Sequence, residues 1–398
     1  MGNSLSINSA NKTYFVLGSQ YFLFFGVLGI FLPYFNLYCY HIGFSGFQIG
    51  ILSGLRSMIL VLFSLIWSAL ADRFQIRKPL YILCHFLSTT LWIFYIFTSD
   101  FLQMLVITFF FGIFYSPIIS FLEAVTIDSL GKEKKKYGRI RAWGSLGFIL
   151  MVILFGKMID LFAIEIILVS IFVGSLLQSF ISTKIPAMTI KKKPPMVPET
   201  NALLKGRIII FLVCAFLMLV SHGTYYGFFS IHLANLGYGN SFIGTTWALA
   251  SLAEILVMIK SNRIFKWFSF ENVLKCSFIV AAARWFVLFV AKSPLAILSS
   301  QISHAITYGT FHMASILYID SLAPDRAKTL AQAVNNAVTY GLGLMTGFFI
   351  SGALYERVDS YFLFMVSGFI ALSGGILFWC FPMVDRQSKN RRPNKITC

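Results

Sequence analysis

The chain alternates between long apolar runs and short polar or glycine-containing breaks. Runs such as 21–40 and 102–119 hold almost no charged residues. Because an α-helix rises about 1.5 Å per residue, roughly 20 residues cross the hydrocarbon core of a bilayer. A helix also satisfies its own backbone hydrogen bonds in lipid as one continuous segment. The pattern therefore predicts an all-α membrane protein that crosses the bilayer many times.

Twelve transmembrane helices are predicted. They cover residues 14–39, 46–71, 79–98, 101–128, 138–160, 163–183, 207–235, 241–260, 271–291, 294–319, 326–356 and 358–381. The longest polar break, with three lysines followed by two prolines at 191–195, separates the sixth span from the seventh. We therefore expect two six-helix halves, 1–186 and 207–384, packed around a central cavity. A cytoplasmic linker at 187–206 would join them, and a cytoplasmic tail would follow at 385–398.

Composition excludes a soluble protein. Hydrophobic residues make up 58% of the chain and charged residues only 12%, whereas soluble domains carry about a quarter charged residues. The lipid bilayer is therefore the expected surrounding of most of the surface.

The net charge of +17 is explained by its placement along the chain. Loops on one side of the predicted bundle hold most of the Lys and Arg residues. The exceptions are Lys157, Lys292 and Arg357 in the alternate loops, and Arg56 and Arg284 inside apolar runs. This asymmetry follows the positive-inside rule, which places the basic loops and both termini in the cytoplasm. We expect a monomeric, multi-pass protein of the cytoplasmic (inner or plasma) membrane with no nucleic-acid partner.

Ionisable residues inside the spans are few, and each is a candidate for function because a charge in lipid is costly. They are Arg56, Glu123, Arg141, His222, Glu254, Arg284, His304 and His312. Metal sites and cofactors other than a coupling proton are not expected, because the six cysteines show no metal-ligand spacing. The chain also lacks the G-x-x-x-x-G-K-[ST] loop of ATP hydrolysis.

Four of these residues are predicted to lie in one layer near the membrane midplane. In an antiparallel hairpin, residues equidistant from the middle of the turn lie at similar depth. The midpoint in the sequence between His222 and Glu254 falls in the turn at 238. That between Glu254 and Arg284 falls in the turn at 269, and that between Arg284 and His304 in the turn at 294. Such a layer can share protons and hold a polar ligand. The structural alternative is a buried Glu254–Arg284 pair that braces the bundle.

Glu123 and Arg141 form a second constellation, nearer the cytoplasm. A bidentate pair of this kind can be opened by the hydroxyls or the carboxylate of a substrate, or it can be a structural salt bridge. His312, two turns below His304, is either a second proton-relay group or a packed polar residue. Arg56 has no evident acidic partner, so it either binds an anionic substrate or extends to the nearer membrane face.

Four aromatic residues stand beside the charged ones, namely Trp143, Tyr225, Tyr226 and Trp247. Their rings can stack on a sugar or on an aromatic ring, or they can simply pack in the core.

The break between the second and third spans carries an acid and a basic turn: Asp72, Arg73, Arg77 and Lys78. Charge pairs and the helix dipole at this point can clamp one cytoplasmic conformation. The segment 68–78, SALADRFQIRK, resembles the G-x-L-A-D-R-x-G-R-R loop of the major facilitator superfamily, with Ser68 and Gln75 where glycines are usual.

Further segments resemble proton-coupled permeases within that superfamily. The segment 137–145, YGRIRAWGS, with Glu123 eighteen residues before Arg141, resembles the lactose-permease type and its relatives, the phenylpropionate permeases. The segments 222–228, 253–254, 284–285, 301–304 and 311–314 resemble the phenylpropionate branch most.

The resemblance implies that Glu123 and Arg141 bind substrate, and that Glu254, Arg284 and His304 couple it to protons. One departure affects the proton site. The sugar permeases carry a glutamate and a lysine where this chain has Thr307 and Gln301. Glu254 is therefore the expected proton carrier, with His304 as the alternative.

Together these observations predict a secondary transporter of the major facilitator fold rather than an enzyme. The expected activity is proton symport that imports a small organic solute by alternating access. The expected solute is either a sugar or short oligosaccharide, or an aromatic carboxylic acid such as a phenylpropionate. The alternatives are an uncoupled facilitator or exporter of the same fold, and a membrane sensor that transports nothing.

Overall fold

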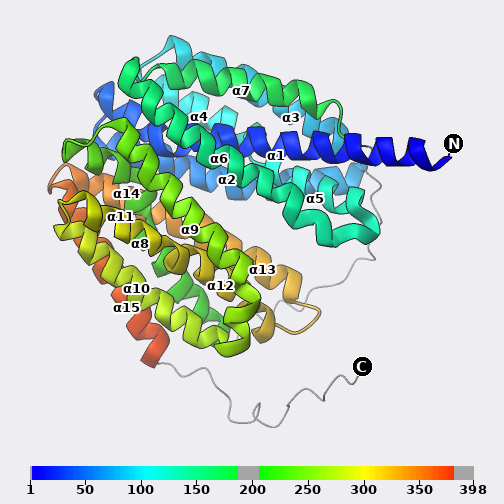
Figure 1. The fold of residues 1–398 in the computed structure, drawn as a ribbon. Coiled ribbons are helices and arrows are strands. Elements are labelled where there is room, and N and C mark those ends of the chain that lie inside the picture. The colour runs from blue at the N-terminus through cyan, green and yellow to red at the C-terminus, as the bar shows by residue number, and fades with distance from the viewer. Residues whose placement is uncertain (1, 187–205, 381–398) are drawn as a thin grey trace, which may run out of the picture.

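The computed structural model describes residues 2–186 and 206–380, which form only helices and turns (Figure 1). Before residue 187 the helices are α1 (Gly2–His41), α2 (Gly46–Phe74), α3 (Arg77–Trp92), η1 (Ile93–Phe97), α4 (Phe101–Tyr115), α5 (Ile118–Leu130), η2 (Gly131–Lys136), α6 (Tyr137–Leu161) and α7 (Ile166–Ser182). After residue 205 they are α8 (Gly206–Asn235), α9 (Asn240–Trp267), α10 (Phe270–Val290), α11 (Pro294–Ile302), η4 (Ala305–Thr310), α12 (Phe311–Leu322), α13 (Lys328–Asn336), η5 (Ala337–Gly343), α14 (Leu344–Tyr355) and α15 (Ser360–Cys380).

The predicted all-α membrane fold is confirmed. Ten helical segments of the described chain are long and apolar enough to cross a membrane, and α7 is a shorter apolar helix. The remaining predicted span, 294–319, is present but broken into α11, the π-helix η4 and α12. The predicted linker at 187–206, apart from Gly206, and the predicted tail at 385–398 lie outside the described residues.

Local chemistry explains where several helices begin and break. Gly43 adopts φ 90° in the turn after α1, a left-handed conformation that favours glycine. Ser45 then caps α2 by accepting the backbone N–H of Gln48 at 3.2 Å, while the Gln48 side chain accepts the Ser45 N–H at 3.0 Å. This reciprocal capping box satisfies two otherwise unpaired donors. Pro117 separates α4 from α5 because it has no N–H to continue the helix.

The helices before residue 187 pack against those after residue 205 mainly through α2 with α14, α6 with α9 and α1 with α8, and α2 also contacts η5. Small residues allow the close approach. A Cβ on Gly50 of α2 would lie 2.7 Å from the Phe348 carbonyl oxygen of α14, and one on Gly156 of α6 would lie 2.7 Å from that of Asn240. Glycine at such contacts is typical of helix packing in membranes.

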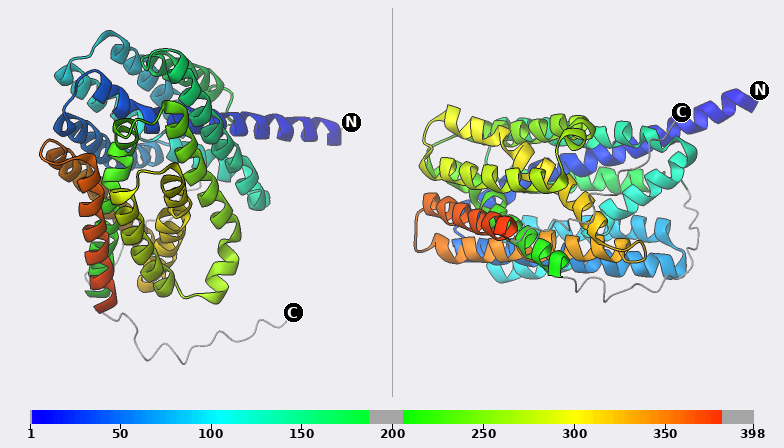
Figure 2. Two further views of the ribbon diagram at one scale, coloured as in Figure 1. Left: turned by 60° about the vertical axis from the view of Figure 1, so that its left-hand side comes forward. Right: turned by 90° about the horizontal axis from the view of Figure 1, so that it is seen from below.

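The two ends of the bundle differ. We call the end where α1 stops and α2 begins the His41 end, and the end where α2 stops and α3 begins the Asp72 end. In Figure 1 the ribbons of the two groups of helices lie close together beside α14 and diverge toward α5 and α13. Figure 2 shows the same helices from two further directions, with most of them running side by side between the two ends.

Two carboxylates hold the groups together at the His41 end. Asp160 of α6 accepts the backbone N–H groups of Asn240 and Ser241, each at 2.8 Å, at the start of α9. Glu356, directly after α14, accepts the backbone N–H of Gly46 at 2.5 Å, at the start of α2. Each acid therefore caps the positive end of a helix from the other group.

Candidate functional site

Arg284 of α10 is the centre of a buried polar cluster. It is only 2% exposed and donates hydrogen bonds to three uncharged acceptors: His304 Nδ1 at 3.0 Å, Gln301 Oε1 at 3.1 Å and Thr307 Oγ1 at 3.3 Å. Among the residues that the structure describes, no carboxylate oxygen comes within 4.0 Å of its guanidinium. The predicted alternative of a Glu254–Arg284 ion pair is therefore not seen in this conformation.

His304 connects Arg284 to Glu254. Because a guanidinium only donates, Nδ1 of His304 must accept, so we assign the ring proton of a neutral His304 to Nε2. Nε2 lies 4.0 Å from Oε2 of Glu254, on α9. The glutamate reaches this position across Gly309, where a Cβ would stand 3.1 Å from the Glu254 Cγ. Glu254, His304 and Arg284 thus form a chain in which the Nε2–H of His304 faces the Glu254 carboxylate at more than hydrogen-bond distance.

Aromatic rings surround this chain. The Arg284 guanidinium lies 4.3 Å from the centre of the Tyr225 ring and 4.6 Å from that of Trp285, within the range of cation–π attraction. The Tyr225 hydroxyl donates to Gln301 Oε1 at 3.0 Å. The Gln301 side-chain oxygen therefore accepts hydrogen bonds from both Arg284 and Tyr225.

His222 belongs to the same layer, as predicted from its depth. Its ring centre lies 6.4 Å from that of His304. Its Nδ1 lies 2.8 Å from the Met218 carbonyl oxygen, to which it can only donate. This leaves Nε2 as an acceptor, and this atom is buried without a hydrogen-bond partner in the described structure.

The broken span explains how these groups meet. The π-helix η4 follows His304 and contains Thr307 and Tyr308, and π-helical turns often occur where a helix places functional side chains. Tyr308 stacks on His304 with ring centres 5.2 Å apart and on His312 at 6.2 Å. Nδ1 of His312 lies 2.5 Å from the Tyr340 hydroxyl of η5. Tyr308 and Tyr340 were not predicted, although the spacing of four residues from His304 to Tyr308 and on to His312 is the signal that finds the stack.

Three of the four predicted aromatic residues, Tyr225 among them, lie in the layer and one does not. The Tyr226 ring centre lies 6.2 Å from that of His304, and Trp247 lies 4.9 Å from Tyr225 with its indole N–H donated to Ser230. Trp143 instead lies against Gly18 of α1 and is 51% exposed.

Glu123 and Arg141 do not form the predicted bidentate pair in this conformation. No carboxylate oxygen of Glu123 comes within 4.0 Å of Arg141 in the described structure. The guanidinium instead lies 3.8 Å from the centre of the Phe25 ring. Its charge acts on the carboxylates of both Glu123 and Glu254. Arg141 is therefore within electrostatic range of one acid of each constellation, although the sequence had kept the two constellations apart.

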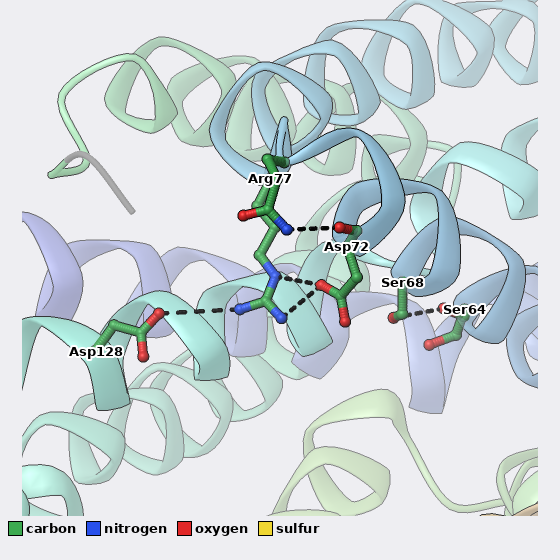
Figure 3. Close-up of polar contacts among 6 residues, drawn as sticks. Ser64, Ser68, Asp72, Arg77 and Asp128 are labelled. Carbon is green, nitrogen blue, oxygen red and sulfur yellow. Dashed lines mark hydrogen bonds and ion pairs between the residues drawn. The ribbon is translucent and has the colours of Figure 1, made fainter. Parts of the chain in front are cut away.

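The loop at the Asp72 end forms its own charged cluster (Figure 3). Arg77 donates to Oδ1 of Asp72 from Nη2 at 2.6 Å and from Nε at 2.8 Å, and its Nη1 lies 3.9 Å from Asp128 of α5. Arg73 instead lies over the Phe74 ring at 5.6 Å. Gln75 ends α2 in a left-handed conformation with φ 58°. A glycine is usual at this position of the superfamily loop, because a left-handed backbone conformation is strained for a residue with a side chain.

Comparison with known proteins shows the family. A model described as "MFS_1 like family" matches residues 14–366. The chain belongs to this family, within the major facilitator superfamily.

Curated relatives and solved structures of the superfamily agree with this placement. The chain is 28% identical to the "Probable 3-phenylpropionic acid transporter" of Escherichia coli (strain K12), over 89% of this chain and 94% of that one. It is 26% identical to the maltose permease of Geobacillus stearothermophilus, over 88% and 89% of the two chains. The crystal structure of the nucleoside transporter NupG (D323A mutant) superposes with a TM-score of 0.85 at 16% identity, over 92% and 99%. The superfamily member described here is therefore a multi-pass membrane protein of a transporter family.

Proposed function

We propose that this protein is a secondary active transporter that imports a small organic solute together with protons. The Asp72 end would face the cytoplasm and the His41 end the outside. The positive-inside asymmetry supports this orientation, because Arg73, Arg77 and Lys78 cluster at the Asp72 end, whereas Lys157 and Lys292 stand almost alone at the other.

The packing of the two halves supports alternating access. Asp160 and Glu356 close the His41 end by capping helices of the opposite half. This arrangement is that of a transporter closed to the outside. For the site to open outward, the two halves must rock apart and both caps must break. The Arg77–Asp72–Asp128 cluster joins α2, α3 and α5 at the cytoplasmic end, which supports its predicted role as a gating loop.

The observation that carries the proposal is the Glu254–His304–Arg284 chain. Glu254 and His304 are the titratable members, while Arg284, Gln301 and Thr307 keep one charge state over the physiological pH range. A proton arriving on Glu254 neutralises the carboxylate beside His304 and removes its attraction for Arg141. The charge between the two halves thus changes with protonation, which is the property that a symporter requires.

The rings beside this chain support a solute with an apolar or ring-shaped face. Tyr226 and Tyr308 are partly accessible and offer aromatic surface, with Trp247 buried against Tyr225 beside them. Arg141 and Glu254 offer opposite charges. Two solute classes fit this combination: a sugar or short oligosaccharide, and an aromatic carboxylic acid. The relatives named for maltose and for 3-phenylpropionic acid support the same two classes.

Transport by purified protein in proteoliposomes tests the proposal. With an imposed inward proton gradient, the vesicles are expected to accumulate labelled 3-phenylpropionate or maltose above the outside concentration, and a protonophore should abolish the accumulation. Movement of the solute down its own gradient, without accumulation above the outside concentration, would instead indicate an uncoupled facilitator or exporter. Absence of any solute movement, including exchange, would favour the sensor.

A further inference from the structure

Arg56 of α2 lies deep in the membrane-spanning part of the N-terminal half. It stands ten residues after Gly46, where α2 begins, so it lies about 15 Å along the helix, near the midplane of a bilayer. A small cavity of about 10 Å³, with room for about one water molecule, lies beside it and is lined by residues of α1, α2, η1 and α4. The side chain is half-buried and keeps part of its surface accessible.

No described residue neutralises the charge of Arg56. Among the described residues, no carboxylate forms an ion pair with Arg56. The ionisable groups near enough to act on its charge are Cys39, Tyr95 and Tyr115, and a thiol and two phenols are mostly or wholly uncharged at neutral pH. Arg284, by comparison, donates three hydrogen bonds. A guanidinium with no counter-ion at this depth is costly, and an anion from outside the chain would relieve the cost.

The wall of the cavity is aromatic. The Arg56 guanidinium lies 4.5 Å from the centre of the Phe31 ring. Phe31 stacks on Phe35 at 4.8 Å, and Phe35 meets Tyr95 edge to face at 5.3 Å. These rings form one continuous surface beside a positive charge. A flat aromatic ring that carries a negative group matches both features in its chemistry. It needs more room than the cavity has in this conformation, so its entry requires the surrounding helices to move apart.

The cavity touches the other half of the molecule. Asn36, which lines it, donates to the Gly227 carbonyl oxygen of α8 at 3.0 Å and to Ser53, another lining residue, at 3.0 Å. The neighbour of Arg56, Ser57, donates to the Tyr340 carbonyl oxygen at 3.1 Å, and Tyr340 in turn contacts His312. A ligand at Arg56 therefore lies where α1 and α2 meet α8 and η5.

We propose that Arg56 and the surrounding rings form a binding site for the carboxylate of an aromatic acid. The site lies in the N-terminal half, apart from the Glu254–His304–Arg284 chain. This inference rests on the proposed transport function and deepens it, because it selects the aromatic carboxylic acid over the sugar.

Thermal unfolding of the purified protein tests the site, because a ligand that binds the native state raises Tm. The buffer contains gluconate in place of chloride. The probes are sodium 3-phenylpropionate, its uncharged amide and sodium chloride. For the wild-type protein we expect a rise in Tm with 3-phenylpropionate and little or none with the amide. Arg56→Gln should weaken the apparent affinity for 3-phenylpropionate at least tenfold, while Arg141→Gln serves as the comparison at the other candidate anion site.

Several results would overturn the proposal. These are an equal response of wild-type protein and Arg56→Gln to 3-phenylpropionate, a loss confined to Arg141→Gln, and the absence of any response in the wild-type protein. An Arg56-dependent response to chloride without one to 3-phenylpropionate would also reject the aromatic acid and leave an inorganic anion.

A second variant covers the case in which Arg56→Gln does not fold. Thr108 lines the same cavity, so Thr108→Asp places a carboxylate beside the arginine. This variant should unfold at the same or a higher temperature than the wild type and lose the response to 3-phenylpropionate. A retained response would contradict the assignment. Because these measurements report binding alone, a protein that binds at Arg56 but transports without proton coupling would refute the proposed symport and leave this site standing.

Discussion

Replacing Asp160 with alanine is expected to shift the protein toward an outward-open conformation. The carboxylate accepts two backbone N–H groups at the start of α9, each at 2.8 Å, and the Asn240 side-chain amide at 3.0 Å. These bonds join the two halves only while the His41 end is closed. Their loss therefore destabilises the closed conformation without affecting the open one.

The size of the shift follows from the geometry. Removing a capping acceptor costs about 0.5–2 kcal/mol. Asp160 is exposed, so water replaces part of what is lost, and we expect about 1 kcal/mol, or roughly a fivefold change in the ratio of the two conformations. Glu356 makes the equivalent contact at the start of α2. Independent contributions add, so the double replacement with alanine should cost about 2 kcal/mol, roughly thirtyfold.

Spin labels at Lys157 and Lys292, which are exposed at the His41 end, measure the separation of the halves by double electron–electron resonance. The Asp160→Ala variant should gain a population at longer distance, and the double variant a larger one. Asp359→Ala is the matched control, because Asp359 is an exposed acid at the same end with no carboxylate contact to the other half in the described structure. Identical distance distributions in all four proteins would refute the role of Asp160 and Glu356 in keeping the His41 end closed.

Three further predictions concern other parts of the chain. In thermal unfolding, the Gln75→Gly variant should be more stable than Gln75→Ala by about 1 kcal/mol. Both variants lose the hydrogen bond to the Asp72 carbonyl oxygen, but only glycine adopts the left-handed backbone conformation without strain. Equal stability of the two variants would contradict this. Arg141→Lys should raise the half-saturating solute concentration in exchange assays at least tenfold, because an ammonium cannot make a two-pronged contact, whereas Arg139→Lys should not. In intact cells a membrane-impermeant maleimide should label a cysteine at position 157 and not one at position 266, and the reverse would overturn the proposed orientation.

The sequence predicted the elements of the fold because a helix that crosses lipid must be about 20 residues long and almost wholly apolar. Length, apolarity and loop charge located the spans, and turn midpoints predicted that His222, Glu254, Arg284 and His304 would meet. The breaks within spans were harder to predict. The π-helices η4 and η5 lie in continuous apolar sequence, and only tertiary packing decides that a helix widens there.

The partners of each charge were the least predictable part of the site. Sequence spacing places Glu254 near Arg284, yet the arginine turns to Gln301, His304 and Thr307, a choice that depends on side-chain conformation. Spacing likewise favours a Glu123–Arg141 pair, whereas the long Arg141 side chain packs on the Phe25 ring. The aromatic wall at Arg56 comes from residues of three helices, α1, η1 and α4, and no local pattern reveals it.

Proton coupling through Glu254 is tested most directly by Glu254→Gln in proteoliposomes, with Glu165→Gln, an exposed acid elsewhere, as the control. Glutamine mimics the protonated carboxylate, so the variant should still exchange internal for external 3-phenylpropionate but no longer accumulate it with a proton gradient. The control should do both. Protonophore-sensitive accumulation that survives in Glu254→Gln would contradict the assignment and leave His304 as the carrier.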